Sequence, residues 1–201
     1  MKTKAVIILL GMILSLNVQA QNWDINLLNK LNSPPNPEAD KTWQFITNTA
    51  TPLNIAAPIT MFLVGYASHN EDLKMKSYES IAAAILNAGV TTAIKLTVKR
   101  ERPFNAYPGL LYKKTDGGSY SFPSGHTSAA FNTATSLSLA FPKWYVIAPA
   151  YAYASAVAYS RMYLGVHYPS DEIGGILIGA GSSLVCFQAH KLFEKVLHPQ
   201  K

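Results

Sequence analysis

The 201-residue sequence has few charged residues and only one cysteine, and both shortages limit what kind of protein it can be. Because Cys186 has no partner, an intrachain disulfide is excluded. Charged residues make up 14% of the chain, against about 25% in an average soluble domain. The stretches without Asp, Glu, Lys or Arg are 42–70, 80–94, 117–142, 144–160 and 173–190. Such segments are typical of a tightly packed helical core or of a protein that crosses a membrane several times.

Two further absences narrow the fold class and the partners. No stretch shows the sustained alternation of apolar and polar residues that marks a half-buried strand, so the sequence predicts an all-α protein. No basic run is interleaved with aromatic residues, which argues against nucleic acid as a partner despite the net charge of +6. The basic excess gathers instead at 95–102 and 113–114, where it would attract an anionic substrate or form an ordinary solvated loop.

Residues 1–20 have the composition of a secretory signal peptide. Two lysines precede an apolar run, and Val18-Gln19-Ala20 places small residues at the positions that a signal peptidase reads. We therefore expect cleavage after Ala20 and a single domain over 21–201, with an uncleaved membrane anchor as the alternative. In either case the following segment is exported.

Five apolar segments further along the chain are predicted to form helices. They are rich in Ala, Leu, Ile and Val, and the links between them contain Pro, Gly, Asn and Asp. The segments are Leu53–Tyr66, Ile81–Val98, Thr127–Phe141, Trp144–Tyr159 and Ile173–Phe187. We expect an all-α helical bundle of about five to six core helices, with the functional residues at one end.

The sequence gives arguments both for and against a bundle that lies in a membrane. Asn132 and several Ser and Thr residues within 127–141 suit a water-soluble bundle. Conversely, the links at 69–77 and after 188 would share the cytoplasmic side of a membrane and contain Lys74, Lys76, Lys191, Lys195 and Lys201. Lys113, Lys114 and the basic cluster at 95–102 would lie on the opposite side and weaken this bias. We interpret the bundle as membrane-embedded, in the inner membrane of a bacterial cell envelope, and keep a soluble periplasmic protein as the alternative.

The first segment whose side chains could bind a ligand or take part in a reaction is Lys95-Leu-Thr-Val-Lys-Arg-Glu-Arg102-Pro103. Lys95 and Arg102 are seven residues apart, which would place both on one face of a helix. Pro103 disfavours helix at Arg102 and would free its guanidinium to reach inward. An Arg fork suits bidentate binding of a phosphate, although a cationic helix end needs no ligand to explain it.

The second segment is Phe122-Pro123-Ser124-Gly125-His126, directly before an apolar helix. Ser124 could cap that helix, and Gly125 would let a ligand approach the backbone closely. The free amides of such a helix start form an anion site, beside which His126 could donate a proton. An ordinary turn and cap is the alternative.

The third segment runs from Ser160-Arg161 to His167-Tyr-Pro-Ser-Asp171. A carboxylate from Asp171 on one ring nitrogen of His167 would fix the tautomer and leave the other nitrogen as a nucleophile. Ser170 is a candidate N-cap for the next helix. A metal site at His167 and Asp171 is disfavoured, because no further His or Cys lies near them and the surrounding Lys and Arg would repel a cation.

All three segments fall at helix ends, and the helix order in an up-and-down bundle places those ends on one face. In that order the motifs resemble those of the type 2 phosphatidic acid phosphatase superfamily, which includes bacterial acid phosphatases and vanadium haloperoxidases. The resemblance spans 95–171 and implies that His167 attacks phosphorus, Asp171 orients it, and His126 protonates the leaving oxygen. It further implies that the phosphoryl oxygens are held by Lys95, Arg102, Ser124, Gly125 and Arg161, with no metal and no other cofactor.

Three functions are compatible with this resemblance. The first is a membrane phosphatase that acts on a phosphorylated lipid such as phosphatidate, a polyprenyl diphosphate or lipid A. The second is a soluble periplasmic acid phosphatase that acts on small phosphate esters. The third, a phosphate-binding protein without turnover, would need a broken catalytic set, and no motif residue is missing.

Overall fold

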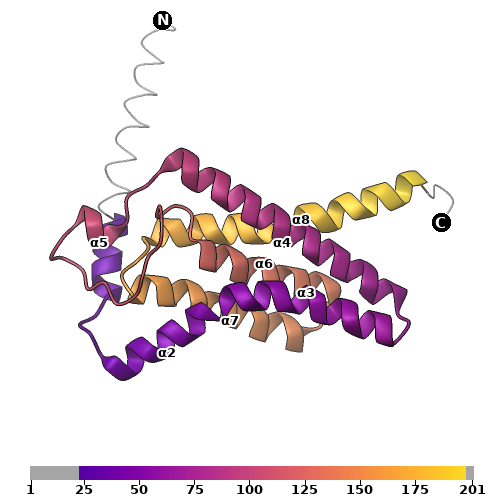
Figure 1. Ribbon diagram of the computed structural model, residues 1–201, viewed down its shortest axis with the longest axis horizontal. Helices are drawn as coiled ribbons and strands as arrows, with labels where there is room; N and C mark the ends of the chain where they lie inside the picture. The colour runs from indigo at the N-terminus through magenta and orange to yellow at the C-terminus, as the bar shows by residue number, and fades with distance from the viewer. Residues whose placement is uncertain (1–22, 198–201) are drawn as a thin grey trace, which may run out of the picture.

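The computed structural model describes residues 23–197. A helical segment at 23–31 is followed by α2 (Pro37–Asn48), α3 (Ala50–Ala67), α4 (Glu71–Val98), α5 (Pro103–Ala106), α6 (Gly125–Ala140), α7 (Trp144–Tyr163) and α8 (Pro169–Leu197). All regular secondary structure within the described residues is helical, without strands, which confirms the predicted class (Figure 1). The expected signal peptide at 1–20 lies outside the described residues.

All five predicted helices occur, and most are longer than the apolar pattern indicated. The helix predicted to begin at Ile81 is the C-terminal part of α4, which begins ten residues earlier. The Asn70 side chain caps this helix by accepting a hydrogen bond from the Leu73 amide, and Glu71 and Asp72 occupy the first turn, where carboxylates are favoured. The cap and the charged first turn therefore start the helix ten residues before the point predicted from the apolar pattern alone.

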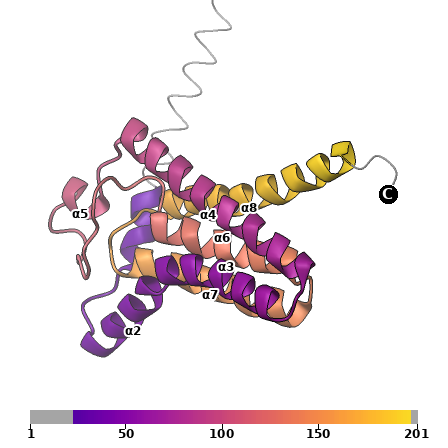
Figure 2. The ribbon, with the colours of Figure 1, turned by 45° about the vertical axis from the view of Figure 1, so that its right-hand side comes forward.

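Helix α6 is the central element of the bundle. It packs against α3, α4, α7 and α8, and ten of its sixteen residues are buried. In Figures 1 and 2 the other long helices run alongside it. The Ser, Thr and Asn residues of α6 therefore face protein rather than the surroundings of the bundle, and its polar composition does not argue for a water-soluble protein.

Glycines allow α8 to approach α6 closely. A Cβ at Gly179 would lie 2.2 Å from the Ser128 carbonyl oxygen, and one at Gly175 would lie 2.8 Å from the Ser124 carbonyl oxygen. Both distances are impossible for a real side chain, so only glycine permits this packing. The contact is consistent with the small-residue interfaces found between helices in lipid.

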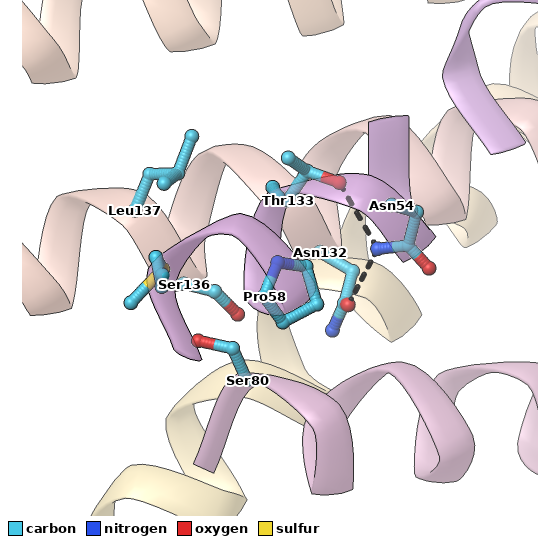
Figure 3. Close-up of a pocket in the computed structure, with 9 residues that line it drawn as sticks. Asn54, Pro58, Ser80, Asn132, Thr133, Ser136 and Leu137 are labelled. Carbon is cyan, nitrogen blue, oxygen red and sulfur yellow. Dashed lines mark hydrogen bonds between the residues drawn. The ribbon is translucent and has the colours of Figure 1, made fainter. Parts of the chain in front are cut away.

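A polar cluster links α3, α6 and α8 inside the bundle. Asn54 donates to the Asn132 side-chain oxygen over 2.8 Å, and Asn132 donates to Ser183 over 2.9 Å. Figure 3 shows Asn54 and Asn132 beside Pro58, around a cavity of about 10 Å³ that is large enough for a single water. These paired amides fix the relative positions of three helices.

The outward faces of α3, α4 and α8 are apolar. Exposed side chains on them include Ile59, Ile85 and Leu177, the last two of which are 69% and 68% exposed. Three helical stretches, Pro37–Ala67, Glu71–Ala106 and Pro169–Phe193, are long and apolar enough to cross a membrane. Large apolar side chains exposed along such helices suit contact with lipid rather than water.

Candidate active site

The basic end of α4 supplies two of the predicted site residues. Helix α4 ends at Val98 because Lys99 adopts a left-handed conformation (φ 50°), a common way for a helix to stop. Arg102 is extended (φ −75°, ψ 150°) ahead of Pro103, which begins α5. The predicted shared helical face of Lys95 and Arg102 is therefore wrong, because the helix stops between them, whereas the predicted effect of Pro103 is confirmed.

The chain segment 119–121 brings Lys95 and Arg102 together instead. The Tyr120 carbonyl accepts from Lys95 Nζ over 2.7 Å and from Arg102 Nη2 over 3.3 Å. Arg102 Nε also donates to the Ser119 carbonyl over 2.7 Å. Backbone carbonyls thus fix two cations side by side, although the two residues approach from different elements.

His167 lies in the short link between α7 and α8 and is 2% exposed. Its Nδ1 is 3.3 Å from Asp171 Oδ2, and its Nε2 is 3.2 Å from Arg102 Nη1. Because the guanidinium can only donate, Nε2 presents its lone pair and Nδ1 carries the hydrogen that Asp171 accepts. Burial lowers the pKa of His167 to about 3, against the opposing attraction of Asp171, so the ring is neutral. A neutral imidazole with its Nε2 lone pair facing cations is suited to attack an anionic phosphate.

Asp171 is fully buried and receives several donors. Arg100 Nη1 donates to Oδ1 over 2.7 Å, while the Ser121 hydroxyl and the Tyr168 amide donate to Oδ2. These bonds hold the carboxylate against the His167 ring. Asp171 therefore has the surroundings of an orienting group whose own position is fixed.

The start of α6 meets the start of α8 at this point. The Ser124 amide donates to the Asp171 carbonyl over 3.0 Å, and a Cβ at Gly125 would lie 3.9 Å from Lys95 Cε. The sequence suggested that the Ser124 side chain caps this helix. It does not, and instead donates to Thr127 Oγ1 over 3.2 Å. The first-turn amides of α6 have no intrahelical partner and are available to an anion.

His126 follows Gly125 and is half-buried. Burial, together with the positive charges of Arg161, Arg102 and Lys95, lowers the pKa of His126 to about 4. The three cations predicted to meet here are therefore close enough to act together on one imidazole. In the ligand-free protein His126 is neutral at physiological pH.

Arg161, in the last turn of α7, is 1% exposed. Its Nη1 donates to Thr47 Oγ1 over 3.2 Å, but its Nε and Nη2 have no hydrogen-bond partner among the described residues. A buried guanidinium with two unused donors is unfavourable unless an anion satisfies them. All eight predicted site residues thus lie at one end of the bundle. The donors of Arg161 indicate that the ligand of this site is an anion.

Several residues that contribute to the site were not singled out from the sequence. Arg100 binds Asp171, Ser121 binds Asp171, and the buried Glu172 accepts a hydrogen bond from Thr127. Ser170, predicted as an N-cap, instead lies within α8, where its hydroxyl accepts from Arg100 over 2.6 Å. Arg100 belongs to the basic cluster at 95–102, but nothing in the local sequence marks it as the partner of Asp171.

A metal centre has no counterpart in the part of the chain that the structure describes. No group of three or more His, Cys, Asp or Glu side chains within residues 23–197 could hold a metal ion. The ionisable groups that do converge are mostly cations, which suit an anionic ligand.

Comparison with known proteins identifies the family. The model of the PAP2 superfamily matches residues 78–195, which include every predicted site residue. The chain belongs to the PAP2 superfamily.

Two relatives each match about half of this chain. An undecaprenyl-diphosphatase from Sulfolobus acidocaldarius is 37% identical over 94 residues, which cover 47% of this chain and 45% of that protein. A lipid A 4'-phosphatase from Bacteroides thetaiotaomicron is 36% identical over 98 residues, which cover 47% of this chain and 44% of that protein. The matched segment therefore spans less than half the length of each of these relatives.

Two solved structures share the fold over most of the chain. The crystal structure of Aquifex aeolicus LpxE has a TM-score of 0.67 and 25% identity, and the match covers 83% of this chain and 95% of that one. A transmembrane PAP2-type phosphatidylglycerolphosphate phosphatase from Bacillus subtilis has a TM-score of 0.69 at 22% identity, covering 91% and 93%. The all-α bundle of this chain is therefore the fold of transmembrane members of the superfamily.

Proposed function

We propose that this protein is a metal-independent phosphatase that hydrolyses phosphorylated lipids through a phosphohistidine at His167. The observation that carries the proposal is the buried Arg161 guanidinium, whose Nε and Nη2 have no hydrogen-bond partner within residues 23–197 and lie near a neutral His167. A phosphoryl group bound there would satisfy these donors and lie against the Nε2 lone pair. Family membership supports the same reaction class.

In the first step His167 Nε2 attacks phosphorus while the bond from phosphorus to the leaving oxygen breaks. His126 in its protonated form gives its proton to that oxygen, so the alcohol leaves neutral. Asp171 stabilises the positive charge that develops on His167, and Lys95, Arg102 and Arg161 stabilise the charge on the phosphoryl oxygens.

In the second step His126, now neutral, takes a proton from a water molecule. The water oxygen attacks phosphorus, the bond between Nε2 and phosphorus breaks, and inorganic phosphate leaves. Both steps use the same imidazole, first as acid and then as base. A single half-buried histidine at the start of α6 is therefore sufficient for the proton transfers.

The protonation of His126 predicts an acidic pH dependence. Burial and the nearby cations lower the pKa of His126 to about 4 in the free protein, and a phosphate monoester releases its second proton with a pKa of about 6. Above about pH 6 neither His126 of the free enzyme nor the free phosphate monoester carries the proton that the leaving group needs. We expect kcat/KM to be highest between about pH 4 and 6 and to fall about tenfold per pH unit above that range. Steady-state rates on p-nitrophenyl phosphate from pH 4 to 9 measure this; a value of kcat/KM that rises from pH 6 to 8 contradicts the assignment.

The apolar outer faces of α3, α4 and α8 support a lipid substrate. In a membrane these faces would place the acyl or prenyl chain of a substrate beside the bundle. We expect kcat/KM on long-chain phosphatidate in mixed micelles, in excess EDTA, to exceed that on glucose 6-phosphate by about tenfold or more, because apolar burial adds binding energy. A short-chain phosphatidate is the matched control for the headgroup. Equal rates on all three esters, or complete inhibition by EDTA that a divalent ion reverses, would count against the proposal.

We further propose that the site faces the periplasm from the inner membrane. Lys74 and Lys76 belong to the first turns of α4, and Lys191 lies toward the end of α8. In Figure 1 the start of α4 and the end of α8 lie at the end of the bundle opposite the end of α4. This distribution fits a cytoplasmic location for that end. Retention of the protein in membranes after carbonate extraction tests the embedding, and release into the soluble fraction would favour a soluble acid phosphatase.

A further inference from the structure

The helical segment 23–31 contacts the site through Asp24, which is 3% exposed. Asp24 Oδ1 accepts from the Ser170 amide over 2.8 Å, and Asp24 Oδ2 accepts from the Ser170 hydroxyl. A carboxylate is favoured at this position because the Ser170 amide belongs to the first turn of α8. A residue 146 positions away in the chain therefore supplies the negative charge at the start of this helix.

Arg100 connects Asp24 to the carboxylate that orients His167. Its Nη2 donates to Asp24 Oδ2 over 2.7 Å, and its Nη1 donates to Asp171 Oδ1 over 2.7 Å. The guanidinium also stacks on the Tyr168 ring, 3.8 Å from the centroid. One cation is thus shared between two buried carboxylates and held in place by an aromatic face.

We propose that Asp24 is a positioning residue for phosphoryl transfer. By offsetting the positive charge of Arg100, Asp24 preserves the negative charge that Asp171 presents to His167. This inference rests on the proposed function of His167. Formation of the bond between Nε2 and phosphorus leaves positive charge on the imidazole, and Asp171 stabilises that charge. Without Asp24, the full positive charge of Arg100 acts on Asp171, which then stabilises the imidazolium less.

This arrangement separates turnover from phosphate binding. Asp24 and Arg100 have no hydrogen bond with Lys95, Arg102 or Arg161 in the described chain, so the cations proposed to hold the phosphoryl group keep their contacts when Asp24 changes. We expect Asp24→Asn to lower kcat about tenfold, a typical size for a group that acts through a catalytic residue. The inhibition constant for inorganic phosphate should change less than twofold.

A double-mutant cycle tests whether Asp24 acts through Arg100. Full-length Asp24→Asn, Arg100→Gln and the double variant are compared with wild type for kcat on p-nitrophenyl phosphate, for phosphate inhibition and for thermal unfolding. The exposed Asp116→Asn is the matched control and should match wild type. If Asp24 acts through Arg100, adding Asp24→Asn to Arg100→Gln lowers kcat no further.

Three results would overturn the inference. Asp24→Asn with wild-type kcat rejects any role for the charge of Asp24. Parallel losses in kcat, phosphate affinity and unfolding temperature indicate a purely structural role. Strictly multiplicative losses in the double variant show that Asp24 does not act through Arg100. An active wild type with any of these results rejects the inference alone, whereas a wild type that hydrolyses no phosphate ester rejects the proposed function and this inference together.

Discussion

Replacement of His167 by asparagine is expected to lower kcat by about 10⁴- to 10⁶-fold, the loss typical of a missing covalent nucleophile. Asparagine fills a similar volume and can donate to Asp171, but it has no Nε2 lone pair facing Arg102. Initial rates on p-nitrophenyl phosphate measure the loss. Quenching in alkaline SDS with labelled substrate should trap a phosphoryl group on wild type that acid then releases, and none on the variant.

The matched control is His69→Asn, at the turn between α3 and α4. His69 is exposed, far along the chain from the site, and has a φ of 54°, a conformation that asparagine tolerates well. This variant should keep wild-type kcat. If His167→Asn retained more than a tenth of the wild-type rate, or if the trapped phosphoryl group persisted on it, another residue would have to be the nucleophile.

The parts of the site that are local in sequence could be predicted well. His167 lies in the short link between α7 and α8, and Asp171 lies only four residues further on, in the first turn of α8, so their contact needs no knowledge of the fold. Pro103 predicts that Arg102 leaves the helix, because a residue before proline avoids helical geometry. The meeting of the three motifs follows from the alternation of helix directions in the bundle.

The contacts that were missed depend on packing between distant segments. Asp24 reaches Ser170 only because the segment 23–31 packs on the start of α8. The left-handed conformation of Lys99 ends α4 at Val98, the predicted end, so the seven-residue spacing of Lys95 and Arg102 does not place them on one helical face. The polar residues of α6 suggested a water-soluble bundle. Composition alone cannot distinguish a helix surrounded by other helices from one exposed to water.

Replacement of Arg161 by glutamine is expected to lower kcat/KM by about 10²- to 10³-fold, the usual loss for one donor to a transition-state oxyanion. The reason is the pair of donors, Nε and Nη2, that find no acceptor in the described part of the chain, on a side chain that is 1% exposed. Glutamine keeps a donor that can reach toward Thr47 but removes the charge and the fork. Steady-state kinetics on p-nitrophenyl phosphate measure the loss, and Arg161→Lys should recover only part of it because a lysine cannot bind two oxygens at once.

Phosphate-dependent thermal stability separates loss of the anion site from loss of the fold. At a phosphate concentration of 100 times the wild-type Kd, binding stabilises the folded protein by about 2.7 kcal/mol. A hundredfold weaker site in Arg161→Gln would leave about 0.4 kcal/mol at the same concentration. The exposed Lys143→Gln, at the opposite end of α7, removes the same charge from the same helix and should keep the full phosphate effect. If Arg161→Gln were still stabilised by phosphate as strongly as Lys143→Gln, Arg161 would not bind the phosphoryl group, and its unpaired donors would need another ligand.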